Sequence, residues 1–549
     1  MAMSKTDLLS RYPKAIVHLR AQRSRKRVGL IFGSGSCTDL GFPKWQKLVE
    51  LVAAHPNVDA NDILSCFTAR GSGAAPATRS LASLTQMIFG KYREREIRNK
   101  NLVNPLTFLQ EQEIKTAWTK IIHQELYRNI DNSTRSTSIS THPYLGSFLD
   151  IIKNSPLTVN YNFDDTLEKL LLDARNQDEV NQTRGYEAID KPNMQFQKEN
   201  SVIYHPNGFL PFIFQDGASA DLVFSDDAFQ DQLIDAATGK YVHLSNHLFR
   251  NTCLLIGLSL DDVTLQSLLR QNAVTNPGNV HYIVHFKTAG VPTDKDREDL
   301  IFRSNFYSYN LYTLFLDNDG IRDLAELISM NKSSFELNYA NCSKKFVYYL
   351  IGSVGAGKST AAKNFRSLIT YDEWIDERIP ELAVPDDTLS PAQREDVNVW
   401  IAEQFRKKNF ALMGHTEGVH LIDRSPLDPL SFGEPQDRPT KAKALVEQIT
   451  DKNSRSIAPG HIIYLDCDLL DVEIRNSLKH KYWPKDRYSQ LLTALQEVYG
   501  SLQTSVICTR GRNAQSVAHE IAKVIFLEEY RPIDIGSELT RIANQTHAA

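Results

Sequence analysis

The sequence predicts an α/β protein with two domains, each built on a mainly parallel sheet. Three observations support this fold class. Short apolar runs typical of strands alternate with helical patterns over much of the chain. Two of these runs, at 28–33 and 346–352, lead directly into glycine-rich loops followed by helical patterns. The length of 549 residues exceeds what one hydrophobic core supports, so two or three domains are expected.

Composition and charge exclude several classes of protein. With 42% hydrophobic and 23% charged residues and a net charge of −4, the chain is typical of a soluble protein, and neither nucleic acid nor a membrane surface is an expected partner. Residues 1–27 contain no apolar segment of the kind found in signal peptides, and the longest apolar stretches, such as 253–258, are far too short to span a bilayer. The six cysteines are scattered without a CxxC pair, which argues against a disulfide framework and a structural zinc site. These features favour a cytoplasmic protein.

The elements divide the chain into two predicted domains. The first, 1–335, contains strand-like runs at 28–33, 156–161, 201–205, 252–258 and 280–286, a helical insertion at about 80–135, and a helical stretch at 321–329. The polar segment 331–345 lacks periodicity and is the best linker candidate. The second domain, 344–530, begins with the strand-like run 346–352, and 531–549 form a C-terminal tail.

The loop of the second domain, 352-GSVGAGKST-360, fits the phosphate-binding pattern G-x-x-x-x-G-K-[ST] between a strand and a helix. Glycines allow backbone N–H groups to face a phosphate, and the helix N-terminus adds partial positive charge. A lysine at this position reaches the β- and γ-phosphates, and the following serine hydroxyl binds Mg²⁺. The loop therefore predicts binding of ATP or another nucleoside triphosphate with Mg²⁺ on Ser359; the alternative is an ordinary glycine-rich turn. The predicted nucleotide-binding residues are Gly352, Gly355, Gly357, Lys358, Ser359 and Thr360.

Downstream segments of this domain resemble the deoxynucleoside and thymidylate kinase families. Asp423-Arg424-Ser425, at the end of a strand-like run, is similar to their D-R-S motif. The basic segment 475–487, with Arg475 and Arg487 at its ends, resembles the lid that supplies cations to the transferring phosphoryl group. The resemblance implies that Glu373, in the acidic run 372–377, acts on the acceptor hydroxyl. The alternative for each of these charged residues is a solvated surface.

The loop of the first domain, 33-GSGSCTDLGFPKW-45, offers G-x-G but has Thr38 where a dinucleotide-binding fingerprint needs its third glycine. The loop resembles the G-A-G-x-S-x-x-x-G-x-P-x-F segment of sirtuins, and later segments 204-YHPNGFLP-211 and 256-IGLSLDDVTLQSLL-269 match in the same order. This resemblance implies a Rossmann-like domain whose loop wraps the pyrophosphate and nicotinamide ribose of NAD. An unrelated α/β domain is the alternative. The residues implied to bind NAD are Gly33, Ser34, Gly35, Asp39, Pro43, Asn207, Gly208, Gly257 and Ser259.

Two asparagines compete for one role in 158-TVNYNFDDTLEKLLL-172. Sirtuin-like enzymes use an N-x-D unit after a strand, where the amide orients the nicotinamide ribose or the attacking water. Asn162 is followed by Asp164 and then by Glu168, as in bacterial members of the family, whereas Asn160 is followed by a second amide. We therefore predict Asn162 and Asp164 as catalytic residues. Asn160 is expected to bond to the strand end or a neighbouring loop.

The predicted general base departs from the family pattern. Sirtuins commonly present H-G, but here Asn207 precedes Gly208, and His205 lies two positions earlier. His205 has the pKa range needed for proton transfer near neutrality. Two possibilities stay open: His205 acts alone as the base, or Asn162 carries most of the activity by orienting a water.

The two resemblances together imply a function. The chain cannot build the four-cysteine zinc module of protein deacylases, and bacterial sirtuin-like domains fused to sensor modules resemble anti-phage NAD hydrolases. We expect an NAD⁺ glycohydrolase, acting in abortive infection, that is gated by nucleotide binding or phosphorylation at the second domain. A homo-oligomer and a phage-derived nucleotide or protein trigger are further expectations from the family. Two alternatives remain: a nucleoside or nucleotide kinase whose sirtuin-like domain binds NAD or ADP-ribose, and a second domain that is a nucleotide switch without transfer activity.

Overall fold

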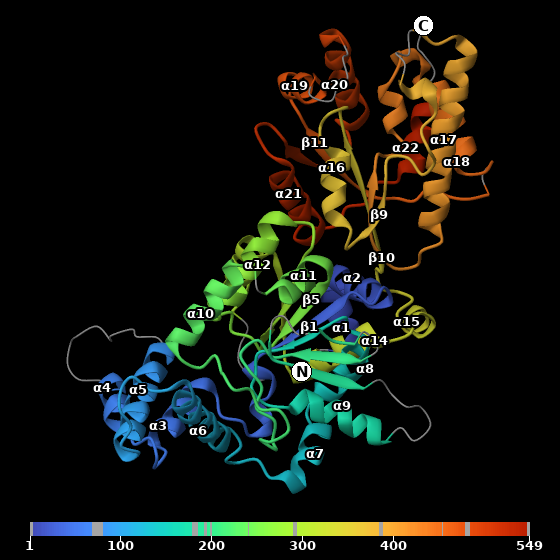
Figure 1. Cartoon of the computed structure of the whole chain (residues 1–549). Helices are drawn as coiled ribbons and strands as arrows, with labels where there is room; N and C mark the ends of the chain where they lie inside the picture. The colour runs from blue at the N-terminus through green and yellow to red at the C-terminus, as the bar shows by residue number, and fades with distance from the viewer. Residues whose placement is uncertain are drawn as a thin grey trace. The chain divides into compact units, whose positions relative to one another are not determined.

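The computed structural model describes residues 4–68, 81–177, 185–191, 195–197, 200–239, 241–288, 294–383, 388–452, 454–477 and 484–545 (Figure 1). The chain divides into two compact units. Unit 1 comprises Met1–Lys5, Gln22–Ala273 and His281–Met330, and unit 2 comprises Thr6–Ala21, Val274–Val280 and Asn331–Ala549. Neither unit is one continuous stretch of sequence, because two short segments from within the first 280 residues belong to unit 2.

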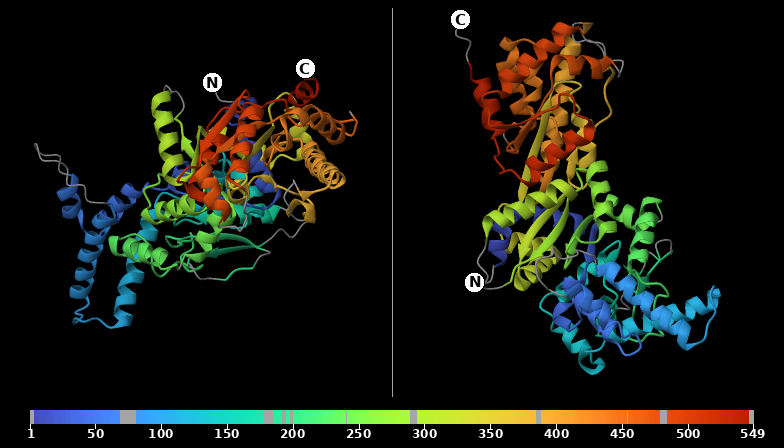
Figure 2. Two further views of the ribbon diagram at one scale, coloured as in Figure 1. Left: turned by 90° about the horizontal axis from the view of Figure 1, so that it is seen from above. Right: turned by 90° about the vertical axis from the view of Figure 1, so that its left-hand side faces the viewer.

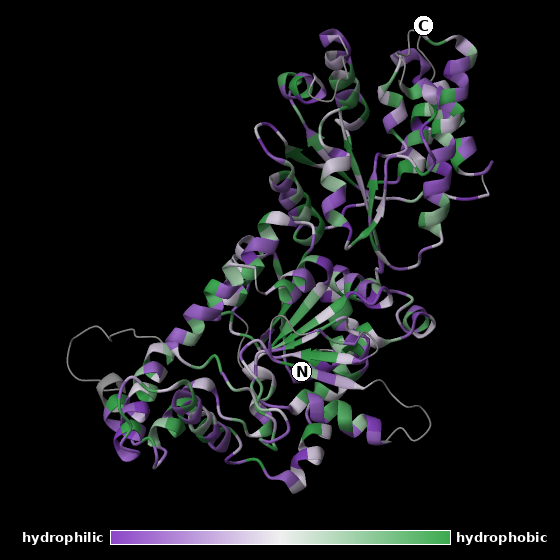
Figure 3. Cartoon of the chain, in the orientation of Figure 1, coloured by the Kyte–Doolittle hydropathy of each residue, from purple (hydrophilic) through white to green (hydrophobic). Residues whose placement is uncertain are grey.

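Unit 1 is built on a seven-stranded sheet whose paired strands are all parallel, in the order β3-β4-β2-β1-β5-β6-β7. Every strand-like run predicted for this part of the chain is a strand. The sheet also contains two strands that the sequence patterns did not predict, β3 and β7. The strands are β1 (Val28–Phe32), β2 (Thr158–Asn160), β3 (Tyr186–Ile189), β4 (Ser201–Tyr204), β5 (Thr252–Ile256), β6 (His281–Phe286) and β7 (Leu311–Leu316). All residues of β1, β5 and β7 are buried, and the strands of this sheet are largely green, the colour of hydrophobic residues, in Figure 3.

Between β1 and β2 the chain forms a group of helices that stands beside the sheet (Figure 2). The longest are α5 (Leu81–Asn99) and α6 (Phe108–Leu126), and α6 begins with a capping box between Thr107 and Gln110. A hydrophobic cluster that includes Trp118 and Phe163 joins this group to the turn after β2. The other helices that lie wholly or mostly in unit 1 are α3 (Trp45–Ala54), α4 (Asn61–Thr68), α7 (Asn132–Ser140), α8 (Leu149–Asn154), α9 (Thr166–Gln177), α10 (Asp226–Ala237), α11 (Val242–Arg250), α12 (Val263–Thr275), α13 (Lys295–Tyr309) and α14 (Asn318–Ser329).

Unit 2 has a five-stranded sheet in the order β12-β11-β8-β10-β9, again with parallel pairs. Its strands are β8 (Lys345–Gly352), β9 (Ile369–Tyr371), β10 (Gly418–Asp423), β11 (His461–Asp466) and β12 (Thr504–Cys508). The helices after β8 are α16 (Lys358–Ala362), α17 (Pro391–Met413), α18 (Arg438–Ile449), α19 (Leu469–Ser477), α20 (Lys485–Tyr499), α21 (Ala514–Phe526) and α22 (Ile535–Ala543). Two N-terminal helices, α1 (Lys5–Arg11) and α2 (Pro13–Ser24), place most of their residues in this unit. Lys14 holds α2 to the end of α21, since its Nζ donates to the carbonyl oxygens of Ile525 at 2.5 Å and Glu528 at 2.7 Å.

Two segments differ from their predicted character. Much of the expected linker 331–345 is helix α15 (Lys332–Asn338), in which Phe335 is fully buried under the guanidinium of Arg20. The expected tail includes α22, whose Ile535 and Leu539 are fully buried in the core of unit 2. In both cases a few apolar residues at helical spacing pack against a core, and the polar residues between them conceal this pattern. No helix among the described residues combines the length and hydropathy needed to cross a membrane.

Candidate functional site

The first candidate site lies at the carboxyl end of the unit 1 sheet, beside β1. β2 and β4 lie on one side of β1, and β5, β6 and β7 lie on the other, so the strand order reverses between β1 and β5. In open α/β sheets ligands bind outside the carboxyl ends of the strands at such a point. The loop after β1 meets the loop after β5 here: Gly35 N donates to Gly257 O at 2.9 Å. Gly257 has a φ of +70°, and a Cβ on it would lie 2.3 Å from Ser36 N. The glycine is therefore required for the contact between the two loops.

The two neighbouring asparagines, Asn160 and Asn162, have different surroundings: the first has a structural role and the second faces the site. Asn160 ends β2 and is fully buried. Its Oδ1 accepts a hydrogen bond from Asn162 N at 3.1 Å, and its Nδ2 donates to Asp164 O at 3.5 Å. Both partners belong to the following turn, so Asn160 has the turn-bonding geometry that the sequence indicated.

Asn162 links the turn after β2 to the glycine loop after β1. Its Nδ2 donates to Gly33 O at 3.2 Å and to Cys37 Sγ at 3.3 Å. Within the described residues its Oδ1 accepts no hydrogen bond, and the residue as a whole is 8% exposed. Two hydrogen bonds therefore orient the amide, and its Oδ1 is left as a free acceptor near the carboxyl end of β1.

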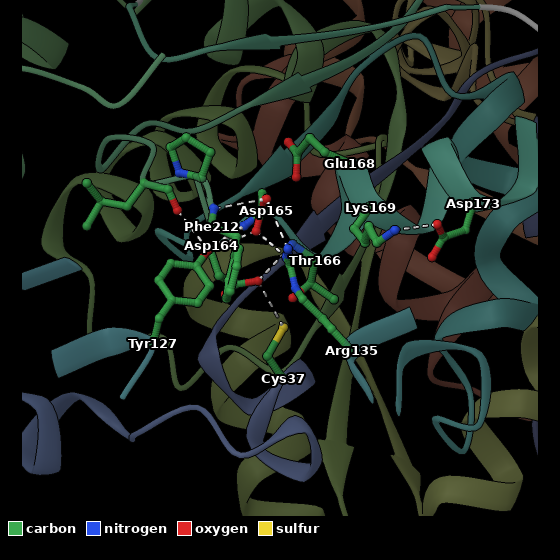
Figure 4. Close-up of polar contacts among 12 residues, drawn as sticks. Cys37, Tyr127, Arg135, Asp164, Asp165, Thr166, Glu168, Lys169, Asp173 and Phe212 are labelled. Atoms are coloured by element: carbon green, nitrogen blue, oxygen red, sulfur yellow. Dashed lines mark hydrogen bonds and ion pairs between the residues drawn. The ribbon is translucent and has the colours of Figure 1, made fainter. Parts of the chain in front are cut away.

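Asp164 follows this amide and faces the same loop (Figure 4). Its Oδ1 accepts from Thr166 N at 3.0 Å and lies 3.9 Å from Cys37 Sγ. Burial raises the pKa of Asp164 above that of an ordinary aspartate. Burial, and then the nearby Asp164 carboxylate, also raises the pKa of the Cys37 thiol far above its usual range. Cys37 is therefore a neutral donor or acceptor and not a thiolate nucleophile.

Asp165 points the other way, toward the helical insertion, and no role for it was predicted from the sequence. It is ion-paired with Arg135 from α7, accepts from Tyr127 Oη at 2.8 Å, and accepts from Phe212 N at 3.1 Å (Figure 4). The guanidinium of Arg135 also lies 5.2 Å above the Phe212 ring. This cluster attaches the helical insertion and the loop after β4 to the turn that carries Asn162.

His205 follows β4, and neither of its ring nitrogens faces an open space. The side chain is fully buried; Nδ1 lies 2.9 Å from Asn162 O, and Nε2 lies 2.7 Å from Glu168 Oε1. Burial opposes the imidazolium, but the Glu168 carboxylate outweighs it, so the pKa of His205 is raised. Glu168 was noted in the sequence only as part of a motif, and its pairing with the histidine required the three-dimensional structure. The histidine predicted as a base thus contacts Asn162 through the backbone.

The other residues predicted around NAD have mixed surroundings. Ser34, Gly35 and Asp39 of the first loop and Ser259 after β5 are exposed, whereas Gly33 is buried and Pro43 is half-buried. Asn207 is buried; its Nδ2 donates to Tyr161 O at 3.4 Å, and its Oδ1 accepts from Gln232 Nε2 at 3.1 Å. Gly208 has a φ of +104°, which only glycine adopts readily.

The second candidate site is the glycine loop between β8 and α16. Gly352, Gly355 and Gly357 have φ values of +143°, +88° and +97°. The ammonium of Lys358 donates to Gly352 O at 2.7 Å and Ser353 O at 2.9 Å, so it lies inside the loop. Burial, with a smaller contribution from a neighbouring arginine, lowers the pKa of Lys358 to about 8.

The end of β10 meets this loop. Ser359 Oγ donates to Asp423 Oδ2 at 2.6 Å, while Asp423 Oδ1 is buried without a hydrogen-bond partner among the described residues. An unpaired buried carboxylate oxygen beside a serine hydroxyl suits a divalent cation, whose preferred ligands are oxygens. Thr360, next along the loop, is exposed.

A network of largely buried charges surrounds Asp423. The guanidinium of Arg424 pairs with Glu373 at 2.8 Å and with Asp428 at 3.3 Å, so the carboxylate predicted to act on an acceptor is held by an arginine. Lys408, on α17, donates to the carbonyl oxygens of Glu373 at 2.7 Å and Asp423 at 2.9 Å. The sequence did not single out Lys408, because one lysine in a long charged helix carries no distinguishing signal.

The predicted lid is only partly described. Arg475 Nη1 donates to Ala356 O at 3.4 Å, and its Nη2 donates to Thr509 O at 2.9 Å, so one end of the segment touches the glycine loop. Arg487 lies in the first turn of α20. The middle of the segment, 478–483, lies outside the described residues.

Comparison with known families gives a match that lies mostly in unit 1. Residues 156–312 match the model of the SIR2-like domain, a stretch that extends from just before β2 into β7 and includes Asn162, His205 and Gly257. The first glycine loop lies outside the match. Domains of this family often use NAD, so the match is compatible with an NAD-related activity of this unit. No curated protein matches the chain.

Proposed function

We propose that unit 1 hydrolyses NAD⁺ to nicotinamide and ADP-ribose. The observation that carries the proposal is the Asn162 amide, oriented by the glycine loop and offering a free Oδ1 at the point where the strand order reverses. The SIR2-like match over 156–312 supports NAD as the ligand class. The exposed Ser34, Gly35 and Ser259 would lie along the cofactor.

The reaction makes modest demands on the protein. The bond between nicotinamide and ribose C1′ breaks, neutral nicotinamide leaves, and water adds to the oxocarbenium-like carbon and releases a proton. Asn162 would orient the ribose or this water, and orientation alone accounts for large rate effects. Asp164, adjacent to the glycine loop, would support the positive charge that develops on the ribose.

The test is nicotinamide release by the purified full chain, with Asn162→Ala as the diagnostic variant. The matched control is Asn132→Ala, the same substitution at an exposed position of α7 in the same unit. We expect Asn162→Ala to lose about 10²-fold or more in kcat with little change in thermal stability, and Asn132→Ala to match the wild type. Equal nicotinamide release by all three proteins would contradict the proposal.

We further propose that unit 2 binds a Mg²⁺–nucleoside triphosphate and that its occupancy gates NAD cleavage. Lys358, Ser359 and Asp423 fit this group: the lysine would bind the phosphates, and the two oxygens would hold Mg²⁺. Bound Mg²⁺ would supply charge neutralisation to the phosphates. Nucleotide binding measured with and without Mg²⁺, in the wild type and Ser359→Ala, tests this assignment.

The connectivity of unit 2 supports gating. The residues after α16 bond to both segments of unit 2 that continue into unit 1: His18 Nε2 lies 3.2 Å from Ser367 O, and Ser367 Oγ donates to Gly278 O at 3.1 Å. Residue 21 leads within seven residues to β1, and residue 280 leads directly into β6. Nucleotide binding that displaced Ser367 would therefore act on the two segments that continue into β1 and β6. Gating requires that the nucleotide favour one of two states, which is tested by nicotinamide release with and without nucleotide.

The physiological role that we propose is anti-phage abortive infection, in which triggered NAD loss halts the host cell. Measuring NAD in infected cells that express the wild type or Asn162→Ala tests this role. The expected result is NAD loss after infection in the wild type alone.

A second candidate function is phosphoryl transfer by unit 2, favoured by the Glu373–Arg424 pair next to Asp423. Burial raises the pKa of Glu373, but Arg424 outweighs burial, and the net shift is downward; the carboxylate is therefore ionised near neutrality. Transfer of labelled phosphate from ATP to deoxynucleosides, abolished in Glu373→Gln, would establish a kinase. ATP binding without transfer would favour a nucleotide switch.

A further inference from the structure

His205, Glu168 and the backbone of Asn162 form a buried chain of hydrogen bonds. The imidazole Nδ1 lies 2.9 Å from Asn162 O, and Nε2 lies 2.7 Å from Glu168 Oε1. The His205 and Glu168 side chains are 0% and 4% exposed. The ring of Phe209 covers the imidazole, with its centroid 4.6 Å from that of His205. No edge of the imidazole is thus left for a substrate.

The position of the protons follows from these partners. A carbonyl oxygen only accepts, so Nδ1 must carry a hydrogen. Nε2 and Glu168 Oε1 then share one proton, either as imidazolium and carboxylate or as neutral imidazole and carboxylic acid. In neither form does His205 have a lone pair directed at a ligand. A general base needs such a lone pair within hydrogen-bond reach of the proton that it removes.

We infer that His205 is a positioning residue, and that the Glu168–His205 pair fixes the peptide of Asn162 instead of moving a substrate proton. The inference rests on the proposed NAD hydrolysis and assigns a different role to the residue that sequence motifs mark as the base. Holding Asn162 O sets the backbone from which its amide reaches the glycine loop. The chemistry is consistent with this role, because neutral nicotinamide leaves without a base and the water proton is lost after C1′ has been attacked.

Two substitutions of His205 separate the roles. The amide nitrogen of His205→Asn can take the place of Nδ1 and still donate to Asn162 O, whereas His205→Ala cannot. We expect His205→Ala to lose about 10²-fold in kcat, and His205→Asn to recover at least about tenfold of that loss. Because general bases contribute about 10²–10⁴-fold, equal losses in two folded variants would overturn the inference.

Glu168→Gln provides a second discriminator. A glutamine amide donates to Nε2 and keeps the hydrogen on Nδ1, so the bond to Asn162 O survives. We expect kcat to fall by less than about tenfold. If His205 were a base polarised by Glu168, the substitution would impose the wrong tautomer and cost about 10⁴-fold, as it does in catalytic triads. A loss of that size in a folded protein contradicts positioning.

The pH dependence gives a readout that does not require activity. The groups acting on the pair are Asp164 and Asp165 of the turn and Tyr186 of β3. Because Glu168 raises the pKa of His205, the shared proton stabilises unit 1 below about pH 6.5, and this stability is lost as pH rises through the higher, folded-state pKa.

Thermal unfolding of the full chain from pH 6 to 9 should show this loss in the wild type, and Glu168→Gln should flatten it. A wild-type profile that matches Glu168→Gln overturns the inference. A wild-type protein that loses stability with rising pH but does not cleave NAD would instead refute the proposed function, and it would still support the buried pair.

Discussion

The buried Arg135–Asp165 pair should control how firmly the helical insertion is attached to the turn that carries Asn162. The two side chains are 6% and 15% exposed, and Asp165 also accepts from Tyr127 Oη and Phe212 N. Arg135→Met removes the charge while keeping much of the side-chain volume. It leaves the Asp165 carboxylate buried with two neutral donors and no cation.

The magnitude follows from this geometry. Removing one partner of a buried ion pair typically costs about 3–5 kcal/mol, because the remaining charge is uncompensated. The matched control is Lys169→Met, which breaks an i,i+4 pair with Asp173 on the neighbouring helix α9 (Figure 4). That pair is about a quarter exposed, with side-chain exposures of 24% and 22%, and such helix pairs contribute only about 0.3–0.5 kcal/mol.

Hydrogen exchange read by mass spectrometry measures the difference locally. A cost of about 3–5 kcal/mol accelerates exchange through local opening by about 10²- to 10³-fold or more, since each 1.36 kcal/mol is a factor of about ten. In Arg135→Met this faster exchange should appear in peptides covering α7 and the 209–214 loop. In Lys169→Met hydrogen exchange should accelerate only about twofold. Exchange in Arg135→Met as slow as in Lys169→Met would refute the reasoning, because it would mean that the charge pair does not hold these segments.

Three further predictions follow from the two sites. Gly257→Ala should abolish NAD binding, measured by calorimetry, because its Cβ would lie 2.3 Å from Ser36 N and its φ of +70° is strained for alanine; unchanged affinity would show that the two loops can separate freely. Asp423→Asn should weaken nucleotide binding about tenfold or more with Mg²⁺ and little without it, measured by fluorescence titration, because its free Oδ1 loses its charge. NAD cleavage between pH 5.5 and 7 should show no ascending limb from histidine deprotonation, because His205 is paired with Glu168; a single-proton rise near pH 6.5 would speak against the pairing.

The sequence predicted the parts of the fold that rest on local patterns. Continuous apolar runs followed by glycine, as at β1 and β8, identified the central strands of both sheets. β7 was missed although all six of its residues are buried, because its sequence LYTLFL follows a charged helix without a turn-forming glycine or proline. β3 was missed for a different reason: its residues are mostly half-buried and mixed in polarity, so they show neither a continuous nor an alternating pattern.

The candidate sites were predictable only where one segment supplies the chemistry. The glycine loop 352–359 and the N-x-D segment at Asn162 are each a single short stretch of sequence. Their residues could therefore be predicted from the sequence. Partners from distant segments could not be: Arg135 and Lys408 are single cations in helices, and nothing local distinguishes a buried lysine or arginine from a solvated one. His205 shows a second limit of prediction from sequence. Its motif position indicates the residue type but not the direction in which its ring nitrogens face.

Asp164, Asp165 and Glu168 are best understood together, because two buried carboxylates and the largely buried Asp165 lie within five residues of sequence. Their side chains diverge: the first faces the glycine loop, the second the helical insertion, and the third the histidine. They lie just before and within the first turn of α9, where the helix dipole stabilises negative charge. Each also has its own donor or cation, which limits the cost of burying it. The acidic cluster after β2 is therefore mainly a three-way anchor for the turn, and the catalytic role that we propose falls on the amide that the turn positions.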